Sequence, residues 1–126
     1  MHRSRSLLTA TLCGAALTLT LATAGCAAGS SSDSFVGTWG DAASDSAPSL
    51  TIEQDGTFSG TDGCNRLIGT ATFDGDTIDF GDAASTLMAC EGVDTWLNGL
   101  DTGEVVDDAL QISDGNGDVI GSLPKQ

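Results

Sequence analysis

The sequence contains no tyrosine, a single histidine, and only four lysine and arginine residues against 18 acidic residues. The histidine is His2, so catalytic pairs in which histidine activates a serine or cysteine have no candidate in the rest of the chain. The shortage of basic side chains excludes nucleic acid as a partner, because binding to phosphates requires a basic surface. It also argues against electrostatic adhesion to anionic lipids.

The side chains that remain for catalysis are carboxylates, which hydrolyse glycosides when they act in pairs. The nominal candidates are Asp62, Asp79, Glu91 and Asp94, but nothing in their spacing selects a pair. We therefore predict that the protein is not an enzyme and has no catalytic, cofactor-binding or metal-binding residues. The acidic side chains are expected to form a solvated, self-repelling surface. A hydrolase that uses carboxylates alone is the least favoured alternative.

The N-terminal segment has the parts of a secretory signal. Two arginines among the first five residues are followed by an uncharged stretch of apolar and small residues over 7–25, directly before Cys26. This order is typical of a signal that is cleaved before a lipid-bearing cysteine. We predict that residues 1–25 are a lipoprotein signal peptide and that Cys26 is the lipidation site. A transmembrane anchor is the alternative, since the run is close to spanning length, but its threonines weaken that interpretation.

The residues after the predicted cleavage site are small and polar. Residues 26–34 include four serines and no large apolar side chain, which is the composition of a flexible tether. The folded domain is then expected over 35–126. The protein is predicted to be extracytoplasmic and lipid-anchored to the cell membrane through acyl chains such as palmitate. We expect it to be a monomer.

The four cysteines divide into two that belong to the N-terminal segment and two that belong to the domain. Cys13 lies in the signal and Cys26 carries lipid, which leaves Cys64 and Cys90. In an oxidising compartment, such a pair is expected to form a structural disulfide. Two thiolates without histidine do not complete a zinc site. A redox pair is also disfavoured, because the spacing is not C-x-x-C.

The domain alternates short apolar-polar segments with turns that are rich in aspartate and glycine, which is typical of antiparallel strands. We expect strands or extended segments over 35–39, 50–53, 57–59, 66–73, 77–80, 85–90, 105–106, 110–113 and 118–123.

One segment has a different periodicity. Val93, Trp96, Leu97 and Leu100 follow the i, i+3, i+4, i+7 spacing of a helical face. The segment 91–100 is therefore predicted to be a helix. The expected fold class is α+β, with a small, curved antiparallel sheet that resembles a cracked barrel and one covering helix.

Three segments, in this order, resemble a known family. They are 36–39 (Val-Gly-Thr-Trp), 58–66 (Phe-Ser-Gly-Thr-Asp-Gly-Cys-Asn-Arg) and 85–90 (Ser-Thr-Leu-Met-Ala-Cys). Over residues 35–123 the chain resembles the META domain (HslJ-like) family of bacterial lipoproteins. The resemblance implies a cracked, barrel-like antiparallel sheet with a helix, and an association with envelope stress. It implies no defined reaction.

Within these segments we expect Gly63, Asn65, Thr86 and Met88 to form a structural motif. Glycine adopts backbone angles that other residues resist, and asparagine holds bends through hydrogen bonds to neighbouring backbone. A disulfide would then join the bend to the segment before the helix. These features explain the motif without a bound ligand.

The predicted function is that of a non-enzymatic envelope module, involved in binding or in the stress response, whose partner is an unknown envelope protein. The alternative is a carrier of a lipid or another small hydrophobic ligand inside a cracked barrel. A carrier requires a cavity. The side chains expected to line that cavity are Phe58, Phe73, Ile78 and Phe80.

Overall fold

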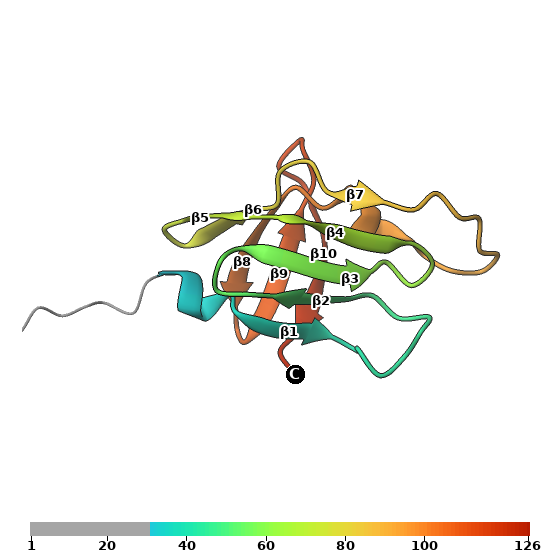
Figure 1. Cartoon of the computed structure of the whole chain (residues 1–126), viewed down its shortest axis with the longest axis horizontal. Helices are drawn as coiled ribbons and strands as arrows, with labels where there is room; N and C mark the ends of the chain where they lie inside the picture. The colour runs from blue at the N-terminus through green and yellow to red at the C-terminus, as the bar shows by residue number, and fades with distance from the viewer. Residues whose placement is uncertain (1–30) are drawn as a thin grey trace, which may run out of the picture.

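The computed structural model of the chain describes residues 31–126 (Figure 1). The predicted signal peptide, the lipidation site Cys26 and the tether up to residue 30 lie outside the described residues. The last residues of the expected tether form the 3-10 helix η1 (Ser31–Ser34). The backbone N–H of Phe35 donates to the Ser32 carbonyl oxygen at 3.0 Å, and the Phe35 side chain is buried in the core.

The described chain forms two five-stranded antiparallel sheets. The first sheet has the order β1-β2-β3-β4-β7, and the second has the order β10-β9-β8-β6-β5. The strands of the first sheet are β1 (Gly37–Gly40), β2 (Ser49–Ile52), β3 (Thr57–Thr61), β4 (Arg66–Thr70) and β7 (Ala84–Ser85). Those of the second are β5 (Thr72–Asp74), β6 (Thr77–Asp79), β8 (Thr102–Val106), β9 (Ala109–Ser113) and β10 (Val119–Pro124).

The turns between neighbouring strands follow from local sequence. In the β2–β3 hairpin, Gly56 has φ +89°, a backbone angle that favours glycine. The Asp55 carboxylate accepts the backbone N–H of Thr57 at 2.9 Å, and this hydrogen bond lowers the pKa of Asp55. In the β9–β10 hairpin, the carboxylate of Asp114 accepts the backbone N–H groups of Asn116 and Asp118 in the same way.

The two sheets cross steeply, and they meet at two seams (Figure 1). At one seam the chain passes from β4 to β5 through Ala71, whose backbone N–H donates to the Gly56 carbonyl oxygen at 2.8 Å. At the other seam β1 lies beside β10, where Trp39 and Lys125 form a β-bridge. The core lies between the sheets and consists of Phe35, Trp39, Leu50, Ile52, Phe58, Leu67, Ala71, Ile78, Phe80, Leu97, Leu100, Leu110, Ile112 and Leu123.

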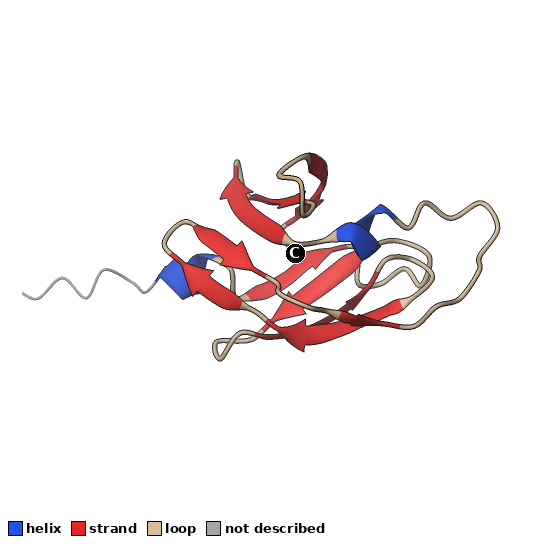
Figure 2. Cartoon of the chain, turned by 90° about the horizontal axis from the view of Figure 1, so that it is seen from above, coloured by secondary structure: helices blue, strands red, loops and turns tan. Residues whose placement is uncertain are grey.

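The predicted α+β class with one covering helix is wrong. The regular structure of the described residues consists almost entirely of antiparallel strands, in two sheets that do not close, and the helical segments among them are single 3-10 turns of four residues. Figure 2 shows these turns, η1 and η2 (Trp96–Gly99), on opposite sides of the molecule, with a long loop extending beyond η2. No helix in the described part is long and apolar enough to cross a membrane.

The segment 91–100 explains this error. A single 3-10 turn is enough to bring its apolar side chains to the core, because the Trp96 ring packs over Gly121 and Leu97 is fully buried. Gly92 has φ +72°, outside the helical region, and Gly99 further lowers the helix propensity. A segment this short also gains little from helix formation alone.

Two strand boundaries also differ from expectation. The predicted strand 66–73 is divided at Ala71 between the two sheets, as β4 and β5. The predicted extended segment 85–90 contributes only its first residue to a strand, β7, because the residues after it are held by side chains of the β3–β4 turn. That turn and the segment it holds form the candidate site.

Candidate functional site

The β3–β4 turn contains the sequence Asp62-Gly63-Cys64-Asn65. The Oδ1 atom of Asp62 accepts the backbone N–H of Cys64 at 2.8 Å and that of Asn65 at 2.5 Å. Gly63 has φ +97°, and a Cβ atom there would lie 2.7 Å from the Ser46 carbonyl oxygen. The turn therefore requires both an acceptor side chain at its first position and a glycine at its second.

Asp62 is fully buried and is the centre of the turn's hydrogen bonds. Its Oδ2 atom accepts the side-chain amides of Asn65 at 3.1 Å and Asn98 at 3.0 Å. Burial raises the pKa of Asp62, but the hydrogen bonds from Asn65, Asn98 and Cys64 outweigh that effect, so the pKa lies below its ordinary value. The carboxylate is therefore held charged by surrounding N–H donors.

Asn65 connects the turn to the segment after β7. Its Oδ1 atom accepts the backbone N–H of Met88 at 2.6 Å and the hydroxyl of Thr86 at 3.4 Å. The Thr86 hydroxyl oxygen in turn accepts the backbone N–H of Arg66 at 2.9 Å. Because Asn65 is also fixed by Asp62, the position of the backbone at Met88 depends on the buried carboxylate.

The Cys64–Cys90 disulfide holds the other end of the same segment. It is present with a Cα–Cα distance of 5.9 Å, which confirms the predicted pairing. Residues 86–90 are thus attached to the β3–β4 turn at Thr86, Met88 and Cys90. We call these five residues the anchored loop.

The structure brings together residues that lie in separate parts of the sequence. All of the predicted structural-motif residues and both disulfide cysteines lie at the β3–β4 turn or on the anchored loop: Gly63, Cys64, Asn65, Thr86, Met88 and Cys90.

Two members of the site were missed by the sequence analysis. Asp62 was considered only as a nominal catalytic acid, although an aspartate directly before a glycine in a turn is a common acceptor of backbone N–H groups. Asn98, on η2, donates to Asp62 and to the Ser85 hydroxyl at 2.8 Å. Its role depends on a distant contact, and no local pattern indicated it.

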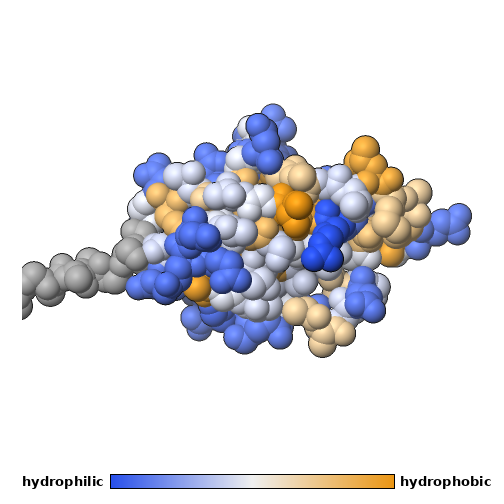
Figure 3. Space-filling view, viewed as in Figure 1, coloured by the Kyte–Doolittle hydropathy of each residue, from blue (hydrophilic) through white to orange (hydrophobic). Residues whose placement is uncertain are grey.

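The anchored loop exposes apolar side chains although its backbone is fixed. Leu87 is 94 % exposed and Met88 is 61 % exposed. Apolar atoms gather at this end of the molecule in Figure 3, beyond β7. Single exposed apolar residues are ordinary, but two neighbouring ones on an anchored loop can contact a partner with little loss of conformational entropy.

The outer face of the first sheet continues from the anchored loop and is rich in hydroxyl groups. One row across the strands, in register, runs Thr38, Thr51, Ser59, Ile68, Ala84. The next row contains Ser49, Thr61 and Arg66. Side chains alternate between the faces of a strand, so these rows face away from the core.

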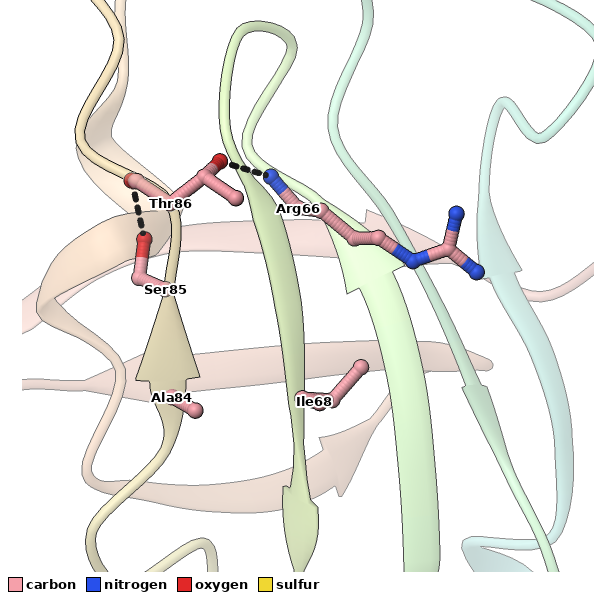
Figure 4. A pocket seen from close by; sticks show the side chains of 5 residues that line it. All are labelled: Arg66, Ile68, Ala84, Ser85 and Thr86. Carbon is pink, nitrogen blue, oxygen red and sulfur yellow. Dashed lines mark hydrogen bonds between the residues drawn. The ribbon is translucent and has the colours of Figure 1, made fainter.

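Two shallow hollows on this face share Arg66. One, of about 200 Å³, is lined by Arg66, Ile68, Ala84, Ser85 and Thr86 (Figure 4). The other, of about 430 Å³, lies over β2 and β3 and includes the hydroxyl residues of those strands. In Figure 4 the Arg66 side chain extends away from the first hollow and reaches across β3 toward β2.

The nominal catalytic acids do not share a site. Asp62 is occupied by its hydrogen bonds within the turn. Asp79 is exposed in the second sheet, where it accepts the backbone N–H of Gly81 at 2.8 Å. Glu91 and Asp94 are exposed after the anchored loop. Among the described residues there is no group of three acidic, cysteine or histidine side chains that could hold a metal ion.

The side chains expected to line a carrier cavity fill space between the sheets instead. Phe58, Ile78 and Phe80 are buried in the core, and the rings of Phe58 and Phe80 meet edge to face with centroids 5.1 Å apart. Phe73 stacks against Phe35 at 5.9 Å. These contacts do not support the carrier alternative.

Comparison with known proteins gives one match. A family model described as META domain matches residues 34–120. The matched range includes the β3–β4 turn, the anchored loop and the outer face of the first sheet. No curated protein and no solved structure matches the chain.

Proposed function

Because the chain belongs to the META domain family, we propose that it is an exported, lipid-anchored META-domain protein that acts as a non-enzymatic binding module at the cell envelope. The N-terminal pattern that ends at Cys26 supports export and acylation. The Cys64–Cys90 disulfide fits an oxidising compartment outside the cytoplasm.

The observation that carries the binding function is the anchored loop. Its backbone is held by Asn65, Thr86 and the disulfide, while Leu87 and Met88 project into solvent. The side chains of Asn65 and Thr86 are used to hold this loop. A preorganised loop with exposed apolar side chains is suited to contact a protein partner of the envelope.

Site-specific photocrosslinking in intact cells tests this function. A photoreactive amino acid at position 87 or 88 is expected to give a discrete adduct with one envelope protein. The same amino acid at Val119, which is 57 % exposed on β10, is the matched control and is expected to give none. Replacing both Cys64 and Cys90 with serine should weaken the adduct, because the loop loses one attachment. The same pattern from positions 87 and 119 would contradict the proposal.

A further inference from the structure

The two basic side chains in the described part of the chain have different surroundings. Lys125 is engaged: its Nζ atom donates to the Val36 carbonyl oxygen at 2.7 Å and lies 4.2 Å from the centroid of the Trp39 ring. The guanidinium group of Arg66 makes no hydrogen bond or ion pair within residues 31–126, and only its backbone is bonded, to Thr86. Arg66 is exposed, so its guanidinium is accessible to a ligand from solvent.

The place where the Arg66 guanidinium lies is rich in hydroxyl groups. It borders the hollow of about 430 Å³, whose wall includes Ser49, Thr51, Ser59 and Thr61. The Thr51 hydroxyl is bonded to Thr38 at 3.2 Å and that of Thr61 to the turn. The hydroxyls of Ser49 and Ser59 make no hydrogen bond within the described part of the chain.

We propose that this hollow binds a small, hydroxyl-bearing molecule with one oxyanion group, a carboxylate or a phosphate. The Arg66 guanidinium would take the oxyanion, because its planar fork of N–H donors matches two oxygens at once. The Ser49 and Ser59 hydroxyls both donate and accept, and therefore suit the hydroxyl groups of a sugar or polyol. This inference goes beyond the proposed function, since it concerns a small ligand and side chains other than Leu87 and Met88.

The charges of the protein limit the class of ligand that can bind in this hollow. The net charge of −14 repels a polyanion at long range, so a molecule with a single oxyanion fits better than a nucleic acid or an acidic polymer. A neutral sugar lacks the group that would pair with Arg66. Asp45 is the one acidic residue in the wall of this hollow, and its carboxylate repels an anionic ligand there.

Titration of the isotope-labelled full chain by NMR tests the proposal. The probes are glucuronate, glucose 6-phosphate, glucose and inorganic phosphate. Glucuronate or glucose 6-phosphate is expected to shift the amide signals of β2, β3 and β4, and glucose is expected to bind at least about tenfold more weakly because it lacks the charge-assisted hydrogen bonds. A response to glucuronate alone would assign a sugar acid, and a response to glucose 6-phosphate alone a sugar phosphate.

Three variants make the test specific to Arg66. Arg66→Gln should weaken binding at least about tenfold with an unchanged melting temperature, because the guanidinium makes no hydrogen bond or ion pair to residues 31–126. Lys125→Gln removes the same charge from another part of the surface and should bind like the wild type. Asp45→Asn should bind more tightly, because it removes a carboxylate that repels the oxyanion.

Several results would overturn the inference. Unchanged binding by Arg66→Gln, or weaker binding by Asp45→Asn, would show that the guanidinium does not hold the ligand. Equal binding of glucose and glucuronate would overturn the oxyanion requirement. Binding of inorganic phosphate as tightly as glucose 6-phosphate would show that the hydroxyl groups of the ligand contribute nothing to binding. Each of these results is independent of crosslinking at the anchored loop.

Discussion

Asp62 is a buried carboxylate whose charge is balanced by N–H donors, two from the backbone and two from asparagine side chains. No basic side chain takes part in this arrangement. A buried charge without an ion pair is costly unless hydrogen bonds replace those it made with water. The four bonds here do so, and they also fix Asn65, which holds the anchored loop.

Replacement of Asp62 with asparagine tests this role. The Asp62→Asn side chain has the same shape, but its NH₂ group would face N–H donors, so we expect the free energy of unfolding to fall by about 2–4 kcal/mol. Urea unfolding measures the change. Asp79→Asn is the control, because Asp79 accepts a single exposed N–H, from Gly81, that the asparagine oxygen can still accept; it should cost about 1 kcal/mol or less. Similar losses in both variants would contradict the role given to Asp62.

The same residue predicts how stability depends on pH. Its pKa in the folded protein is below the ordinary value of 3.8, so its contribution is complete above that value and is lost as the pH falls through the folded pKa. The difference in unfolding free energy between the wild type and Asp62→Asn should therefore be constant near neutral pH and shrink on acidification below about pH 4. Urea unfolding at a series of pH values measures this difference. A difference that grows on acidification would contradict a lowered pKa of Asp62 in the folded protein.

Gly63 has a conformation and a position that exclude a side chain. Gly63→Ala would have to adopt φ +97° and place its Cβ atom 2.7 Å from the Ser46 carbonyl oxygen. We expect a loss of at least about 2 kcal/mol in unfolding free energy. Gly115→Ala is the matched control, since Gly115 has open space around it and no positive φ, and it should stay within about 0.5 kcal/mol of the wild type. Equal stability of the two variants would contradict this explanation.

At the scale of elements, the anchored loop follows β7 directly but lacks the ladder of hydrogen bonds that a strand has. Thr86 makes the last backbone hydrogen bond to β4, from its N–H to the Arg66 carbonyl oxygen at 3.1 Å. Beyond Thr86, the Asn65 side chain and the disulfide hold the loop in place of backbone hydrogen bonds to a neighbouring strand. The loop should therefore be more sensitive to loss of the disulfide than the sheets are.

Loss of the disulfide should lower stability and free the loop. In Cys64→Ser/Cys90→Ser we expect a decrease of about 3–4 kcal/mol, since the bond closes a loop of moderate length in the unfolded chain. Calorimetry with and without reductant measures it, and the reduced wild type should melt like the variant. Amide hydrogen exchange at Met88 should accelerate more than exchange in β9. Equal melting temperatures under oxidising conditions would contradict the stabilising role.

Local signals in the sequence predict the hairpins and the pairing of the cysteines, but not how the sheet divides. The Asp-Gly turns specify neighbouring strands, because the required backbone angles are set by the turn residues themselves. Nothing in the sequence around Ala71 indicates that the chain changes sheets there. The apolar spacing of 91–100 predicted a helix, but a single turn buries Leu97 and Leu100.

The candidate site shows the same division between local and distant information. The motif residues could be selected from sequence because glycine, asparagine and cysteine have recognisable structural roles. Asn98 could not, since it reaches Asp62 from η2 across a long stretch of sequence. The free guanidinium of Arg66 likewise becomes evident only when the register of β2, β3 and β4 is known.

At the scale of the whole molecule, an acidic domain follows a short polar segment and a predicted lipid-bearing cysteine. All 18 acidic residues lie in the described part of the chain, together with only two basic ones. Such a surface gains nothing from anionic headgroups, so attachment to a membrane would depend on the acyl chains alone. Localisation should therefore change sharply when the predicted acylation site is removed.

Replacement of Cys26 tests the anchor. The native protein is expected to lack residues 1–25 and to carry acyl mass on Cys26, whereas Cys26→Ser should carry none and leave the membrane fraction. Intact-mass spectrometry and fractionation measure these outcomes. Arg66→Gln, made in the same background, is the control and should stay with the membrane. A native protein that retains Met1, or a Cys26→Ser variant that remains membrane-bound, would contradict the anchor.

The seam between β1 and β10 has a consequence for biosynthesis. Trp39 pairs with Lys125, so one of the first strands to be made must wait for one of the last segments. A chain leaves the ribosome at about 5–20 residues per second, so β1 emerges several seconds before Lys125. Contacts between such distant segments also slow the folding step itself. The last pairing therefore cannot form until residue 125 is available, and until then the unpaired edge of β1 is a place where another chain could add a strand.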